Sequence, residues 1–108
     1  METLAATTYD RFCRRMVARV RGIWGESFNE QSADDLRQRV DRWITRARDY
    51  GLDSERAVVR YIDSTCAMGD DFEDRKVCSW AREILTDAGM SPELKAVRLW
   101  ARVKQKVL

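Results

Sequence analysis

The sequence of 108 residues contains no histidine. Histidine is the commonest general base, the usual partner of a nucleophilic serine or cysteine, and a frequent zinc ligand. Glycine motifs that cradle phosphates, such as G-x-G-x-x-G, are absent as well. We therefore expect a protein that is not an enzyme and that has no catalytic residue, no cofactor and no metal ion.

Proline and glycine are scarce, with one proline, Pro92, and five glycines. Folds rich in strands need such residues at every turn, so their scarcity favours long helices. A hydrophobic share of 44% beside 35% charged residues suits a small protein with one core. The length is also typical of one domain. We predict a single helical domain over residues 1–108.

Long apolar runs are missing too, because no stretch approaches the ~18 uncharged apolar residues that span a membrane. The N-terminus lacks the basic and then apolar layout of a secretion signal. The three cysteines, Cys13, Cys66 and Cys78, are an odd number without a close pair, which argues against a disulfide framework and for a structural, buried role. We expect a cytoplasmic protein that does not bind membranes.

Apolar residues recur at spacings of three and four along most of the chain, which predicts amphipathic helices. Capping residues and glycines mark where these helices start and stop. The expected bounds are Thr8 to Arg21, ended by Gly22 and Gly25; Ala33 to Tyr50, capped by Ser32 and ended by Gly51; a third helix capped by Asp53 and ended by Gly69; a fourth with the stripe Val77 to Leu85, ended by Gly89; and a fifth that begins at Ser91-Pro92. Together they predict an all-α fold, a compact bundle of four to five helices.

The apolar stripes also indicate which residues are buried. We expect the centre of the core at the stripes Leu36 to Tyr50 and Ala57 to Cys66, with Trp43, Phe72 and Trp80 filling the gaps. In the last helix, the residues expected inward or at an interface are Leu94, Val97, Trp100, Ala101, Val103 and Val107.

Two groups of apolar residues are candidates for binding a partner protein. Residues 22–31 are interpreted as a loop that carries Trp24 and Phe28. Aromatic residues in a loop either cover the core or belong to a binding patch, where tryptophan is over-represented. Leu99 with Val103 would form a second exposed patch on the last helix.

Residues 69–74, Gly-Asp-Asp-Phe-Glu-Asp, form an acidic turn. Carboxylates suit calcium, but an EF-hand loop needs acids at alternating positions and a terminal glutamate, and here the acids are adjacent. We expect a solvated turn that caps the next helix, with Phe72 plugging the core.

A DNA-binding interpretation rests on residues 47–56, which read as a helix, a glycine turn and a second helix. That second helix opens with Asp53 and Glu55 and offers only Arg56 and Arg60 to phosphates. The net charge of +2 also falls short of the positive field that nucleic-acid binding usually needs. A small helical DNA-binding regulator is therefore the alternative function, and nucleic acid is not the expected partner.

A family resemblance adds a further expectation. The residues that carry it are Ala47, Tyr50-Gly51-Leu52, Ser54-Glu55, Val58, Arg60-Tyr61-Ile62, Gly69-Asp70-Asp71-Phe72, Trp80, Glu83-Ile84-Leu85, Ser91-Pro92, Lys95 and Leu99. Over about residues 44–100 the chain resembles small proteins encoded in bacterial type VI secretion gene clusters near spike and effector genes. The resemblance implies an accessory that binds a secreted effector or spike protein, either as an adaptor or chaperone for loading or as an immunity protein that neutralises a toxin. It implies no cofactor.

Overall fold

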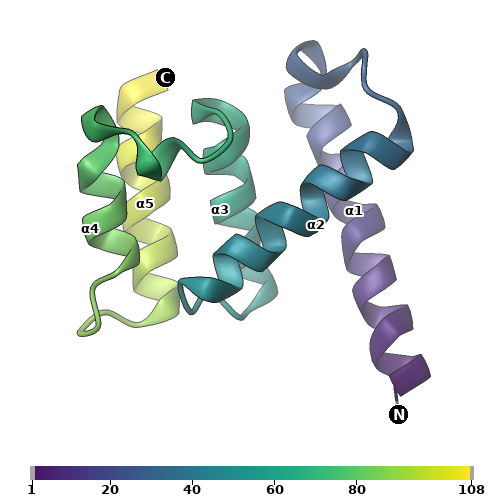
Figure 1. Ribbon diagram of the computed structural model, residues 1–108, viewed down its shortest axis with the longest axis horizontal. Helices are drawn as coiled ribbons and strands as arrows, with labels where there is room; N and C mark the ends of the chain where they lie inside the picture. Colours follow the sequence, from purple (N-terminus) through teal and green to yellow (C-terminus); the bar gives the residue numbers. More distant parts are fainter. Residues whose placement is uncertain (1, 108) are drawn as a thin grey trace. The chain divides into compact units, whose positions relative to one another are not determined.

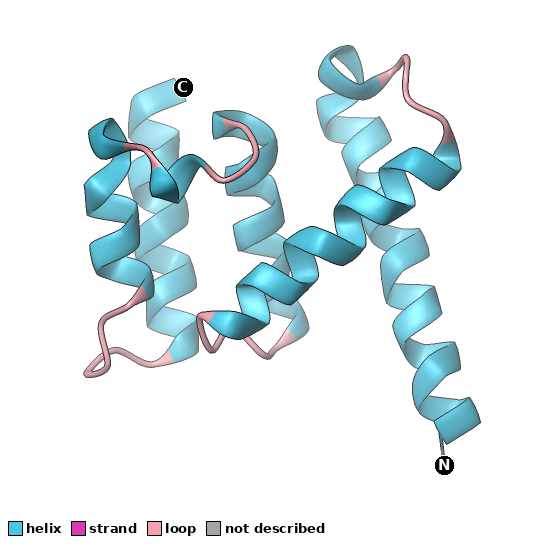
Figure 2. Cartoon of the chain, viewed as in Figure 1, coloured by secondary structure: helices cyan, strands magenta, loops and turns pink. Residues whose placement is uncertain are grey.

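The computed structural model describes the backbone of residues 2–107 and the side chains of residues 8–107. Over this range it contains five α-helices, two short 3-10 helices and no strand (Figure 1 and Figure 2). The elements are α1 (Glu2–Phe28), α2 (Ala33–Asp49), α3 (Glu55–Met68), η1 (Phe72–Asp74), η2 (Lys76–Cys78), α4 (Ser79–Leu85) and α5 (Pro92–Val107). The predicted all-α bundle of four to five helices is confirmed. Among the described residues, no helix combines the length and the apolar character needed to cross a membrane.

The chain divides into two units, Met1–Arg42 and Trp43–Leu108, and the boundary falls within α2. In the first unit, Tyr9 of α1 donates a 2.7 Å hydrogen bond to Asp41 of α2, and Arg37 forms a 2.8 Å ion pair with Asp10. The buried apolar residues of this unit are Phe12, Cys13, Met16, Val20, Phe28, Leu36 and Val40. The single domain over residues 1–108 stays a prediction.

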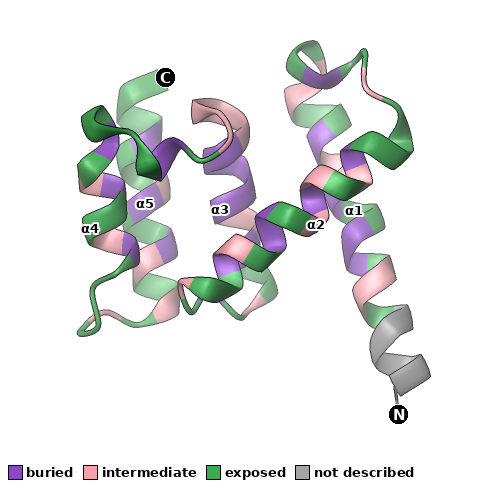
Figure 3. Ribbon diagram, in the orientation of Figure 1, coloured by how far each residue is buried: buried purple, intermediate pink, exposed green. Residues whose placement is uncertain are grey.

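In the second unit α3 packs against α5, and α5 also packs against α4 (Figure 1). In α5 the buried residues lie on one side of the helix, whereas five consecutive residues of α3, 61–65, are all buried (Figure 3). The largest fully buried side chains of the unit, apart from Glu73, are Trp43, Ile44, Leu52, Tyr61, Ile62, Phe72, Leu85 and Leu99. The prediction that Trp43 and Phe72 fill the core is confirmed. Trp80 is half-buried instead, with the cations of Arg102 and Lys106 over its ring.

Three of the helices begin at a serine whose hydroxyl accepts a hydrogen bond from a free backbone N–H group. Ser32 accepts from the N–H of Asp35 at 3.0 Å, and Ser91 accepts from the N–H of Leu94 at 3.2 Å, so both predicted caps are confirmed. The predicted cap of α3 is wrong by one residue. Ser54, and not Asp53, accepts from the N–H of Ala57.

Glycine ends α2 as predicted. Gly51 has φ +85°, its N–H donates to the carbonyl of Arg48 at 2.8 Å, and the N–H of Leu52 donates to the carbonyl of Ala47 at 2.9 Å. These two bonds form a Schellman motif, which satisfies carbonyls that have no partner inside the helix. Leu52 is fully buried immediately after the motif, so the turn also fixes the direction in which the chain enters α3.

The predicted loop at residues 22–31 is wrong, because α1 continues to Phe28. The helix bends at Trp24, whose backbone has φ −113° and ψ 21°, and both Gly22 and Gly25 lie within it. A glycine inside a helix costs only about 1 kcal/mol relative to alanine, so two glycines weaken a helix without ending it. The connection to α2 therefore shrinks to residues 29–32.

The fourth helix is shorter than predicted, because η1 and η2 precede it and it ends at Leu85 instead of Gly89. Val77 was expected on the buried stripe but is 81% exposed, and Cys78 is buried in its place. A 3-10 turn has three residues per turn, so it shifts the phase of a stripe that is read with helical spacing.

Candidate functional site

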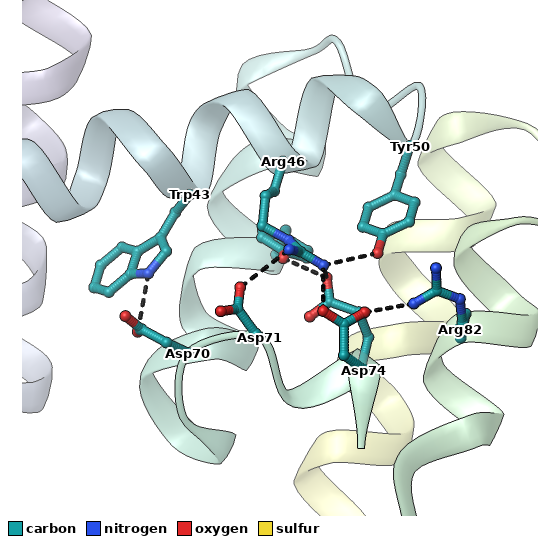
Figure 4. A network of polar contacts seen from close by, with 9 residues as sticks. Trp43, Arg46, Tyr50, Asp70, Asp71, Asp74 and Arg82 are labelled. Carbon is teal, nitrogen blue, oxygen red and sulfur yellow. Dashed lines mark hydrogen bonds and ion pairs between the residues drawn. The ribbon is translucent and has the colours of Figure 1, made fainter. Parts of the chain in front are cut away.

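The densest group of polar contacts joins the last turns of α2 to the acidic turn at residues 69–74 (Figure 4). At its centre the guanidinium of Arg46 forms ion pairs with Asp71 at 3.1 Å, Glu73 at 3.3 Å and Asp74 at 3.2 Å. It also donates to the hydroxyl of Tyr50 at 3.2 Å. One arginine near the end of α2 thus contacts three of the four acids of the turn.

Glu73 is the buried member of this group, with only 1% of its surface exposed. Its Oε2 accepts a 2.6 Å hydrogen bond from the hydroxyl of Tyr61 in addition to the contact with Arg46. Burial and this bond to a carboxylate raise the pKa of Tyr61 well above its ordinary value, since both favour the neutral hydroxyl. The predicted solvated turn is therefore wrong for Glu73. Its carboxylate lies in the core because Arg46 and Tyr61 supply partners there.

Further contacts fix the two ends of the turn. The indole N–H of Trp43 donates to Asp70 at 3.1 Å, and Arg82 of α4 pairs with Asp74 (Figure 4). Partial desolvation would raise the pKa of Asp74, but the hydrogen bonds and charges of Arg82 and Arg46 outweigh it and lower that pKa. The turn is thus held from α2 at one end and from α4 at the other.

This arrangement is built to hold the fold together and offers little for catalysis. Among the described residues, no group of three or more cysteine, aspartate, glutamate or histidine side chains has the geometry to hold a metal ion. Three of the four acids of the turn form ion pairs with Arg46 or Arg82, and Asp70 accepts a hydrogen bond from Trp43. We expect this network to contribute stability and not chemistry.

The cysteines offer no evident nucleophile. All three are free thiols, and Cys13 and Cys78 are buried, as the sequence predicts, whereas Cys66 is half-buried. Burial raises the pKa of Cys13, which disfavours the reactive thiolate.

The four residues predicted to bind a partner do not form the expected patches. Leu99 and Val103 are fully buried, and Phe28 is 6% exposed. For Leu99 and Val103 the prediction of an exposed patch is wrong, because α5 turns the face that carries Ala96 and these two residues into the core. Trp24 is half-buried at the bend in α1.

The opposite face of α5 carries exposed apolar residues that were predicted to lie inward or at an interface. Leu94 is 41% exposed and Val97 46% exposed, and Ala101 is exposed as well. Their spacing of three and then four residues puts them on one face of the helix. The apolar residues of α5 occupy both faces, so periodicity alone does not reveal which face packs inward.

A small hollow adjoins this face, between the first turns of α3 and α5. It is lined by Arg56, Ala57 and Arg60 of α3 and by Glu93, Ala96 and Val97 of α5. The lining residues Ala57 and Ala96 are buried, and their short side chains take up little of the space beside the two arginines.

No protein-family model, curated protein or solved structure matches the chain.

Proposed function

We propose that the chain is a non-enzymatic, protein-binding accessory that acts in the cytoplasm, with an effector or a spike protein of a bacterial type VI secretion system as its partner. It acts either as an adaptor or chaperone that holds its partner for loading, or as an immunity protein that neutralises a toxin. The partner class comes from the resemblance over residues 44–100, and protein binding as the activity has a structural observation in its favour.

The observation that carries the proposal is the outward apolar face of α5, formed by Leu94, Val97 and Ala101. The opposite face of the same helix is already buried through Ala96, Leu99 and Val103. The fold does not need the exposed face, because the helix already packs through its other face. The exposed residues can therefore contact another protein, and burial of such apolar surface is the main favourable term in protein association.

Several of the residues that carry the resemblance stabilise this fold. Gly51, Ser54 and Ser91 cap helices, and Tyr61 and Phe72 lie in the core. The resemblance therefore supports a shared helical unit, and the partner surface has to be sought among exposed residues.

The proposal is tested by expressing the tagged chain together with the products of neighbouring genes. A pull-down at moderate salt is followed by size-exclusion chromatography with light scattering. We expect one effector or spike protein to co-elute at a fixed stoichiometry. A chain that elutes alone in the presence of every neighbour contradicts the proposal.

A small helical DNA-binding regulator is the second candidate, and one observation favours it. Arg56 is exposed and Arg60 half-buried in α3, the helix that follows the Gly51 turn. The net charge of only +2 stands against it, since it falls short of the positive field that DNA binding usually needs. Retention on duplex DNA at increasing salt separates the two candidates, because a regulator would bind DNA with an affinity that falls steeply as salt rises.

A further inference from the structure

The hollow between α3 and α5 brings two uncompensated cations beside an apolar face. Arg56 and Arg60 are one helical turn apart and both line the hollow. Neither guanidinium forms an ion pair with any residue that the structure describes, and the Nε atom of Arg60 is shielded from solvent without a hydrogen-bond partner. Glu93 lines the same hollow but pairs with neither arginine.

This lack of partners contrasts with arginines elsewhere in the chain. Arg14 pairs with Asp10 at 2.9 Å across one helical turn, and Arg46 contacts three carboxylates. Like charges four residues apart in a helix repel each other, and an opposite charge between them relieves the repulsion. A carboxylate that enters the hollow from outside would supply that charge.

The neighbouring surface of α5 adds the apolar part of the recognition. Leu94, Val97 and Ala101 extend over about two helical turns, roughly 10 Å along the axis. Exposed Arg98 and Lys104 stand on the same helix. The surface therefore combines apolar side chains with basic ones, and Glu93 is the one acid that lines the hollow.

We infer that the hollow and the outward face of α5 bind an acidic amphipathic helix of a partner protein. Its apolar residues pack on Leu94, Val97 and Ala101, and its carboxylates meet Arg56 and Arg60. A helix suits this surface because its anchors recur at spacings of three and four residues, the spacing of the exposed residues of α5. Strand addition is excluded over residues 2–107, since no sheet edge exists there. The inference rests on the proposed protein-binding function and names the surface and the partner chemistry.

The test is a selection from a displayed library of amphipathic helical peptides, about 20 residues long, with Asp, Glu, Lys and Arg all allowed at the polar positions. The full chain is the bait, and binding of the enriched peptides is then measured by fluorescence anisotropy. The test variant is the double substitution Arg56→Glu and Arg60→Glu. The matched control is Arg11→Glu with Lys76→Glu, which changes the net charge equally at two exposed positions outside the surface. Melting curves verify that both variants fold.

We expect enrichment of peptides rich in Asp and Glu, and a loss of affinity of at least about tenfold in the test variant against less than about twofold in the control, since reversal replaces attraction with like-charge repulsion. Enrichment of basic or neutral peptides, no enrichment, or equal losses in both variants overturns the inference. So does tighter binding of duplex DNA that the test variant alone abolishes. If a neighbouring gene product still co-elutes with the test variant as with the parent, the proposed function stands and this surface is wrong. If no neighbour binds the parent, the proposed function itself fails.

Discussion

Arg46 is the side chain on which the stability of the second unit depends most directly. Replacing it with Ala leaves Glu73 buried without its cation, and removing one partner of a buried ion pair costs about 3 kcal/mol. We expect urea denaturation of Arg46→Ala to show a free energy of unfolding lower by roughly this amount. Arg98→Ala, at an exposed position of α5, serves as the control and should change it by less than about 0.5 kcal/mol. An Arg46→Ala variant as stable as its parent would show that the network contributes nothing.

Tyr61 makes the free energy of unfolding fall at alkaline pH. Its pKa in the folded chain lies well above the ordinary value of 10.0, because burial and Glu73 both disfavour the phenolate. Above that ordinary value the unfolded chain releases the phenolic proton while the folded chain keeps it. Stability is therefore complete below about pH 10 and falls as the pH rises further, by at most about 1.4 kcal/mol per pH unit for this group.

Tyr61→Phe tests this dependence. The variant loses the hydrogen bond to Glu73 and should be less stable at pH 7 by about 1–2 kcal/mol. It should also lose less stability than the parent between pH 9 and pH 11, which chemical denaturation at each pH measures. Parallel curves for the two proteins would contradict the assignment.

The sequence predicted individual residues well where a local pattern determines their environment. Phe72 and Trp43 are buried as expected, and Ser32 and Ser91 cap helices as expected. The burial of Glu73 was missed. Its partner Arg46 is 27 residues away in sequence, and no local pattern links the two.

Gly22 and Gly51 differ in backbone conformation, and substitution of each tests what a glycine contributes inside a helix and just after one. Gly22 lies inside α1 and Gly51 follows α2 with φ +85°, and a Cβ added at either position meets nothing within 4 Å. Only the backbone conformation differs, so the two substitutions should have opposite signs. We expect Gly22→Ala to stabilise by about 0.5–1 kcal/mol and Gly51→Ala to destabilise by about 1–2 kcal/mol. Thermal unfolding of both variants checks this, and equal signs would contradict it.

The sequence predicted where helices begin and end better than it predicted which face of α5 is buried. Capping serines accept backbone N–H groups three residues further on, and Gly51 ends α2 through its own backbone. Both signals are local, so Ser32, Gly51 and Ser91 could be identified from the sequence. Which face of α5 packs inward depends on where α3 and α4 lie, and apolar residues occur on both faces. For this reason the predicted exposed patch of Leu99 with Val103 lies in the core, while Leu94 and Val97, predicted to be inward or at an interface, are exposed.

For the chain as a whole, the core and the proposed partner surface belong to the same unit. The region of the family resemblance, about residues 44–100, falls inside the unit Trp43–Leu108. Many of the residues that carry the resemblance, such as Ser54, Asp70 and Phe72, cap a helix, hold the acidic turn or fill the core. Arg60 carries the resemblance as well and lines the hollow beside α5. We propose that the surface for a partner is built on that frame, from the outward face of α5 and the two arginines of α3.

The most direct test of this account is to compare Val97→Glu with Val77→Glu in co-expression with the neighbouring gene products. Both residues are exposed, so both variants should melt like the parent, and only Val97 lies on the proposed surface. We measure the amount of partner that co-elutes in size-exclusion chromatography with light scattering. We expect Val97→Glu to lose the partner and Val77→Glu to retain it. Equal retention by the two variants would contradict the account.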